Sequence, residues 1–102
     1  MFISIPVDNE NLQEAKIAKM AEAKGWAVID FDEGVVKSMQ FSDSYRPDFA
    51  DWIDFIVVEN RYENIIDFLN EGIMVLARRE GQDRIEDIIE AFKFKELDEA
   101  GF

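Results

Sequence analysis

The clearest pattern of hydrophobic and polar positions lies in the second half of the chain. Residues 53–58 form a nearly continuous apolar and β-branched run, which is typical of a strand covered on both faces. Residues 60–71 change to helical spacing and are followed by Gly72, a common residue after a helix end. The apolar stripe of this helix consists of Tyr62, Ile65, Ile66 and Leu69. Residues 73–77 are a second apolar run, so this region predicts a βαβ unit with a right-handed crossover.

The first half of the chain predicts a strand, a helix and a β-hairpin. Residues 2–5 form a short apolar strand, and residues 11–24 are rich in good helix formers. The apolar stripe of this predicted surface helix is narrow and consists of Ile17, Met20 and Ala21. Residues 26–31 and 35–41 flank a turn of Asp, Glu and Gly, which indicates a β-hairpin.

The remaining segments complete a single domain. Residues 42–51 are polar and contain a proline, which favours a loop, and a last helix is predicted from about Arg84. Two pairs have the spacing of a helix N-cap and its partner: Asn60 with Glu63, and Asp83 with Glu86. Residues 98–101 are predicted to fray. The resulting order is β-α-β-β-β-α-β-α, an α/β fold with helices on both faces of a mixed five-stranded sheet.

Composition limits the classes of function. The chain has 102 residues, so residues 1–102 are expected to form one domain. A hydrophobic content of 48% is too high for intrinsic disorder. The formal charge of −12 argues against binding to nucleic acid or to an anionic membrane, because both depend on basic side chains. The oligomeric state has no signature in the sequence.

Two absent residue types exclude common chemistry. Without Cys, the chain forms no disulfide and offers no thiolate to a metal. Without His, it lacks the commonest metal ligand and the usual general base at neutral pH. The first residues have no basic segment followed by a long apolar one, and no apolar run reaches bilayer length. We therefore expect a cytoplasmic protein.

Several segments, spread over nearly the whole chain, resemble one family. They are Ile5-Pro6-Val7-Asp8, residues 28–34, Asp54 at the start of a buried strand, residues 69–73, and residues 88–92 with Leu97 after them. Together they resemble the dinitrogenase iron-molybdenum cofactor biosynthesis family, that is, NifX/NafY-like domains. The resemblance implies a ribonuclease-H-like three-layer α/β/α fold. It also implies a role in binding or carrying iron-sulfur and iron-molybdenum cluster precursors.

The chain departs from the family at the positions that would matter for ligands. The usual His-Phe-Gly segment falls near Met20-Ala21-Glu22, so no ligand residue is carried over. The Gly-Pro turn after the fourth strand is replaced by residues 59–62. The chain is thus interpreted as a divergent member that lacks the usual His and Cys, and no cofactor is predicted except a cluster by family analogy.

Polar side chains at the carboxyl ends of the predicted parallel strands form one candidate site. In open α/β sheets, ligands bind beyond these ends. The candidates, here called the rim, are Asp8, Glu59, Asn60 and Arg78. Arg79 leaves the strand in the opposite direction, so at most one of the two arginines reaches a ligand. The alternative is that Asn60 and Asp83 only cap helices and that the arginines only offset local acidity.

Three aromatic residues, Tyr45, Phe49 and Trp52, cluster around the loop at 42–51 and form a candidate partner surface. We call this loop, together with Trp52, the aromatic loop. The alternative is that these side chains fold under the edge of the sheet. A metal-dependent hydrolase is a further alternative for a ribonuclease-H-like fold. However, the first strand carries apolar Ile3 and Ile5 where such nucleases carry a carboxylate, so no catalytic residue and no metal ligand are predicted.

The sequence therefore favours a non-catalytic accessory protein that acts through a protein partner or a small ligand. The alternative function is a carrier of iron-sulfur or iron-molybdenum clusters. The alternative fold is a ferredoxin-like sandwich. Strand pairing separates the two folds, because the family fold places the first and fourth strands side by side and parallel.

Overall fold

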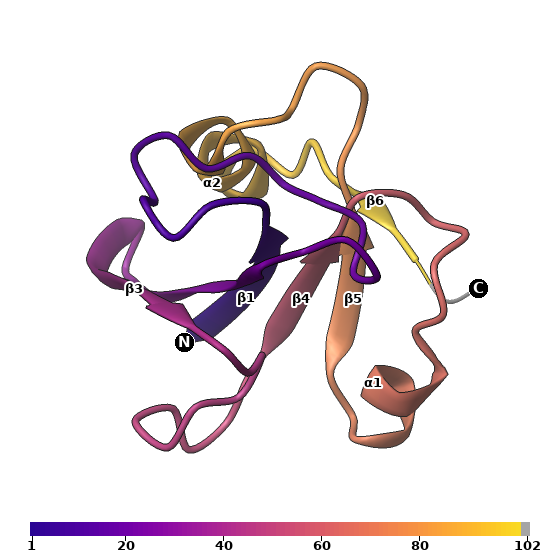
Figure 1. The fold of residues 1–102 in the computed structure, drawn as a ribbon, viewed down its shortest axis with the longest axis horizontal. Coiled ribbons are helices and arrows are strands. Elements are labelled where there is room, and N and C mark those ends of the chain that lie inside the picture. Colours follow the sequence, from indigo (N-terminus) through magenta and orange to yellow (C-terminus); the bar gives the residue numbers. More distant parts are fainter. Residues whose placement is uncertain (101–102) are drawn as a thin grey trace.

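The computed structural model describes residues 1–100 and shows a mixed sheet with helices packed against it (Figure 1). The strands are β1 (Phe2–Val7), β2 (Gly25–Asp32), β3 (Val35–Ser42), β4 (Phe55–Val58), β5 (Met74–Ala77) and β6 (Asp98–Glu99). The helices are α1 (Ile66–Asn70) and α2 (Ile85–Lys93). Within the described residues the sheet has six strands in the order β3-β2-β1-β4-β5-β6. No helix among them has the length and apolar character needed to cross a bilayer.

Strand pairing agrees with the family fold and rejects the ferredoxin-like alternative. Strand β1 pairs with β4 in parallel, with Ile3 opposite Phe55, and β4 pairs with β5 in parallel. Strand β2 is antiparallel to β1. The prediction of five strands was wrong, because the segment expected to fray forms β6, antiparallel to β5. Ala100 beside it is buried, and Gly101 of the same predicted segment lies outside the described residues.

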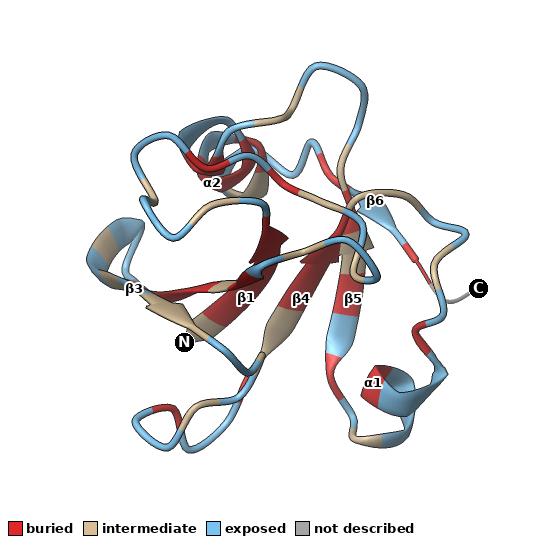
Figure 2. Cartoon of the chain, in the orientation of Figure 1, coloured by how far each residue is buried: buried red, intermediate tan, exposed pale blue. Residues whose placement is uncertain are grey.

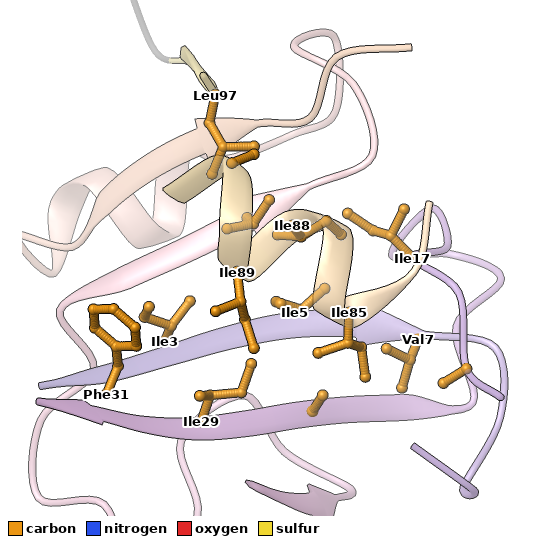
Figure 3. Packing of buried hydrophobic residues seen from close by; sticks show 14 residues of the cluster. Ile3, Ile5, Val7, Ile17, Ile29, Phe31, Ile85, Ile88, Ile89 and Leu97 are labelled. Carbon is orange, nitrogen blue, oxygen red and sulfur yellow. The ribbon is translucent and has the colours of Figure 1, made fainter. Parts of the chain in front are cut away.

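Helix α2 covers one face of the sheet, as its spacing predicted. Its buried residues Ile85, Ile88 and Ile89 pack over the isoleucines of β1 and β2 in one apolar cluster (Figure 3). Phe92 adds edge-to-face contacts with Phe31 and Phe55, at centroid distances of 5.5 and 4.9 Å. The predicted cap was wrong by one residue. The N-cap is Arg84, whose backbone N–H donates to Asp87 Oδ2 at 3.4 Å.

The opposite face is covered by α1, which is much shorter than the predicted helix at 60–71. Ile65 and Phe68 are buried against the sheet, but Tyr62 is 88% exposed and Ile66 is 61% exposed. Asn60 is not a helix cap, because its Oδ1 accepts the N–H of Tyr62 at 2.8 Å and closes a turn. The Glu63 carboxylate does not take part in a helix cap either. It accepts backbone N–H groups of Glu59 at 3.0 Å and Met20 at 2.7 Å.

The predicted helix at 11–24 does not form. This segment is a series of turns, which in space lies beside the end of β1 and the start of α2 (Figure 1). Its backbone bonds outward, with Ile17 N–H donating to Asp83 O at 2.8 Å and Ala18 N–H to Pro6 O at 2.9 Å. Ala15 and Ile17 are buried by this docking. Tertiary hydrogen bonds and burial therefore outweigh helix propensity, which amounts to only a few tenths of a kcal/mol per residue.

The hairpin prediction is confirmed, with β2 and β3 antiparallel around a tight turn. Glu33 and Gly34 both have positive φ angles, of 51° and 80°, as a type I′ turn requires. Strand β3 lies at the edge of the sheet and is mostly exposed or half-buried, whereas β1 and most of β4 are buried (Figure 2).

Candidate functional site

The carboxyl ends of β4 and β5 bring three of the four rim residues together. One terminal nitrogen of Arg78 donates to Glu59 Oε1 at 2.8 Å, and the other donates to Asp83 Oδ1 at 2.7 Å. Asn60 Nδ2 donates to Glu59 Oε2 at 2.7 Å. Arg78 thus joins the end of β4 to the residues that precede α2. The sequence placed a helix N-terminus at Asp83 beside the rim, but it did not predict that the Asp83 carboxylate binds Arg78.

Burial and charge explain the protonation state of this cluster. The side chains of Arg78 and Glu59 are only 19% and 18% exposed. The hydrogen bond from Arg78, followed by that from Asn60, lowers the pKa of Glu59 below its ordinary value, against the opposing effect of burial. Glu59 is therefore ionised at neutral pH. Arg78 Nε is buried and has no hydrogen-bond partner within the described chain, so one of the guanidinium donors remains unsatisfied.

Asp8, the fourth rim residue, makes contacts of a different kind. Its Oδ1 accepts the N–H of Lys16 at 2.9 Å, and its own N–H donates to Lys16 O at 3.1 Å. Within residues 1–100 it shares no hydrogen bond or ion pair with Glu59, Asn60 or Arg78. Asp8 therefore closes the segment that follows β1. A ligand at the rim would have to displace contacts that the chain already makes.

Arg79 follows the expected alternation along β5. Its Nε donates to Asp98 Oδ1 at 3.0 Å, and both side chains of this pair are 51% exposed. Arg78 points to the rim, whereas Arg79 points to β6. Only one of the two arginines therefore reaches the rim.

The residues present do not fit a metal or an iron-sulfur cluster ligated by this chain. Clusters are held by Cys thiolates and, in some sites, by His, and the chain contains neither residue type. No three Asp or Glu side chains in the described part of the chain gather as a metal site would require. The carboxylates of Glu59 and Asp83 are both paired with Arg78.

The three aromatic residues differ in exposure, because Tyr45 is half-buried whereas Phe49 and Trp52 are exposed. Tyr45 packs edge-on against Trp26 and Phe68, at centroid distances of 5.9 and 5.0 Å. Its hydroxyl donates to Glu71 Oε2 at 2.5 Å, and this bond, followed by burial, raises the pKa of Tyr45. These contacts hold Tyr45 against the domain, and its role in binding a partner stays a prediction.

Phe49 and Trp52 remain available on the surface. Each is 45% exposed. Phe49 contacts Phe2 edge-on at 6.3 Å, and the Arg46 guanidinium lies over the Trp52 ring at 5.5 Å. These contacts fix the two rings without covering them. Their role in binding a partner stays a prediction.

A third feature, which the sequence did not reveal, is an open groove of about 930 Å³ on the α2 side of the sheet. We call it the α2 groove. Its apolar lining comes from Leu12, Val36, Met39, Phe41, Ile85 and Ile89. Its walls are the segment after β1, helix α2 and edge strand β3. In the sequence, only the alternating apolar residues of β3 pointed to this groove. The predicted helix at 11–24 hid it, because such a helix was expected to cover the sheet.

Comparison with known proteins places the fold among solved structures. No protein-family model matches the sequence, and no curated protein matches it significantly. A crystal structure described as a "putative dinitrogenase", MJ0327 from Methanocaldococcus jannaschii, is similar with a TM-score of 0.73 and 17% identity. That match covers 99% of this chain and 95% of the other.

Two further structures are similar over almost their whole length. The crystal structure of PH0822 has a TM-score of 0.70 and 17% identity, over 97% of this chain and 96% of the other. The NMR structure of a "putative NifB protein" from Thermotoga, TM1290, has a TM-score of 0.67 and 18% identity, over 99% and 95% of the two chains. At these identities the likeness shows a shared fold. Two of the three structures are described by nitrogenase-related names, which is consistent with the family that the sequence resembles.

Proposed function

We propose that this protein is a non-catalytic accessory protein that acts by binding a protein partner or a small ligand. One observation carries the proposal. The polar groups at the rim bind one another, whereas apolar side chains stay accessible at the aromatic loop and in the α2 groove. Catalysis by acid-base or metal chemistry needs polar groups that are free to engage a substrate. Binding needs exposed apolar anchors.

We also propose that the sheet and its helices form the ribonuclease-H-like three-layer α/β/α arrangement. Alternate residues of β2 and β4 enter two separate apolar clusters, one with α2 and the other with Phe68 of α1. Helices on both faces of a mixed sheet are what that three-layer architecture requires.

A comparison of captured proteins tests the binding role. Tagged wild-type protein and the variant Trp52→Ala are incubated with native lysate of the source organism, and the recovered proteins are quantified. Trp52 is 45% exposed and lies outside both apolar clusters, so its loss should weaken capture without unfolding the domain. A partner that wild type recovers and Trp52→Ala does not would assign the aromatic loop. Turnover of a phosphoester with magnesium or manganese would refute the non-catalytic role.

A role in nitrogenase cofactor biosynthesis is the second candidate, and the named neighbours are its support. Because the chain has neither Cys nor His, a cluster would need ligands from a partner or from carboxylates. Anaerobic reconstitution with iron and sulfide tests this candidate. Stoichiometric iron uptake with charge-transfer absorbance would support a carrier, and its absence would leave only the accessory role.

A further inference from the structure

We propose that two copies of this chain pair through the free edges of their β3 strands and form a symmetric dimer with one continuous sheet. The two β3 strands would run antiparallel, with Gln40 of each copy at the two-fold axis. Such a dimer goes beyond the binding role proposed above and does not depend on it. Three observations support it: the open state of the β3 edge, the register that this edge allows, and the charges at its two ends.

The two edges of the sheet differ in how open they are to a further strand. The edge formed by β6 has two residues, Asp98 and Glu99, and both are acidic. Short and charged strands of this kind prevent edge-to-edge pairing. Strand β3, at the other edge, has eight residues and pairs only with β2 in the described sheet (Figure 1). Residues 1–100 give its outward N–H and C=O groups no other backbone partner, so these groups can receive another strand.

The regular part of β3 has a defined centre. The ladder with β2 is irregular at Lys37, which forms a bulge between Val36 and Ser38. From Ser38 the strand pairs regularly to its end at Ser42. Two such stretches overlap completely in an antiparallel pair only when Gln40 lies opposite Gln40 of the second copy. The geometry of the strand therefore specifies the register of the dimer.

In this register each face of the strand meets matching side chains. Met39 lies opposite Phe41 of the second copy, and both belong to the face that packs against α2, where they are only partly buried. A thioether beside an aromatic ring is a favourable contact. On the other face Ser38 lies opposite Ser42 and Gln40 opposite Gln40, so uncharged groups that can hydrogen-bond to one another meet.

The charges at the two ends of this stretch are complementary in the same register. Lys37 precedes the stretch and Asp43 follows it, so each lysine would lie beside the aspartate of the second copy. Both side chains are exposed and make none of the ion pairs in the described part of the chain. Because Lys37 lies in the bulge and Asp43 lies beyond the strand, strand alternation does not fix the face to which either side chain points. Two ion pairs can therefore close the ends of the seam.

The formal charge of −12 on each copy opposes association but acts mostly at long range. Helix α2 lies over β1 and β2 (Figure 3), so four strand spacings, about 19 Å, would separate the two α2 helices of the dimer. Charges farther apart than the Debye length, about 8 Å at physiological ionic strength, are largely screened. Glu86 and Glu90 of α2 would therefore repel their counterparts only weakly.

Sedimentation equilibrium over a range of protein concentrations, at physiological salt, tests for the dimer. The dimer should form reversibly. Hydrogen exchange should then show outward amides within Ser38–Ser42 protected at high protein concentration and unprotected after dilution. A protein that stays monomeric up to millimolar concentration, or a dimer in which these amides exchange freely, would overturn the inference.

Introduced cysteines test the register. The chain has no Cys, so one substitution supplies the only thiol. Gln40→Cys should cross-link to the second copy with the shortest bifunctional thiol reagents, because residues directly opposite have Cβ atoms about 5 Å apart. Ser38→Cys is the matched control: it is exposed on the same face, but the two copies of this position would lie four residues, about 13 Å, apart. Equal yields from the two variants would contradict the register.

Charge reversal separates the register from an effect of net charge. Lys37→Asp and Asp43→Lys each replace two attractive pairs by two repulsive ones, so each should weaken the dimer roughly tenfold, since an exposed pair contributes about twofold. The two variants change the net charge in opposite directions. Combining them restores the pairs at the wild-type charge of −12 and should restore the dimer. A stronger dimer with Asp43→Lys, or no recovery in the double variant, would show that these pairs do not form.

These experiments use the purified protein alone, so their failure would leave the proposed binding role intact. Conversely, if Trp52→Ala recovers the same lysate proteins as wild type, the aromatic loop loses its role as the partner surface. A dimer measured with purified protein would stand in that case.

Discussion

Replacing Arg78 by methionine should destabilise the fold far more than the same change at its neighbour Arg79. Arg78 makes two charged hydrogen bonds, at 2.8 Å to Glu59 and 2.7 Å to Asp83. Its side chain is 19% exposed and that of Glu59 is 18% exposed, so this contact is shielded from water. Methionine keeps most of the apolar stem of the arginine and removes its charge and its donors.

The expected loss follows from the two contacts. A hydrogen bond to a charged group contributes about 1.5–3 kcal/mol, and the shielded contact with Glu59 belongs in this range. The contact with Asp83 contributes about 0.5 kcal/mol, because that carboxylate is 51% exposed. The buried and unpartnered Nε of Arg78 disappears with the substitution, which offsets about 1 kcal/mol of the loss. The net destabilisation is about 2 kcal/mol.

Urea denaturation followed by tryptophan fluorescence measures this loss, and thermal unfolding should show a decrease in Tm of about 10 °C. Arg79→Met is the control. Arg79 pairs with Asp98 at 3.0 Å, but both side chains are 51% exposed, so its loss should cost about 0.5 kcal/mol or less. Equal destabilisation by the two variants, or a loss below about 0.5 kcal/mol for Arg78→Met, would show that the rim cluster does not stabilise the fold.

Three further predictions follow from the cluster and the core. Folding lowers the pKa of Glu59, so the contribution of Glu59 to the free energy of unfolding is complete above its ordinary pKa of 4.5. This contribution is lost as the pH falls through the pKa of Glu59 in the folded state. The stability of Arg78→Met, measured by acid unfolding, should therefore depend less on pH than that of wild type. Gly25→Ala would place a methyl group against the Phe41 ring and 2.7 Å from a backbone oxygen; denaturation should show a loss of about 2 kcal/mol, part of which Phe41→Leu should restore. Ile88 is 1% exposed, so Ile88→Ala should cost about 3 kcal/mol and Ile88→Val about 1 kcal/mol in the same assay.

The sequence predicted correctly those elements in which the local pattern of residues is compatible with only one type of secondary structure. The run at 53–58 gave the buried strand β4, and the turn at 32–34 specified the hairpin, because Gly34 adopts a positive φ of 80° there. The isoleucines of α2 repeat at helical spacing and all three face the sheet. In each case local preference and tertiary burial agree.

The rim illustrates what a strand-end argument can and cannot predict. Parallel strands end at one edge of a sheet, so the meeting of Glu59, Asn60 and Arg78 could be predicted from their positions. The second bond of Arg78 could not, because Asp83 reaches Arg78 only when the chain turns before α2. Side-chain partners of this kind depend on loop conformation, which short-range patterns do not encode.

The failed prediction of a helix at 11–24 and the presence of the α2 groove have one physical origin. A helix is about 10 Å wide, and strands lie about 4.8 Å apart, so one helix covers roughly two strands of a sheet. The described sheet has six strands, and on the α2 side the nine residues of α2 are the only helix packed against it. A helix at 11–24 would cover further strands, but this segment docks as turns beside α2 and leaves β3 partly exposed. The docking that buries Ala15 and Ile17 therefore also exposes the surface on which we expect a partner to bind.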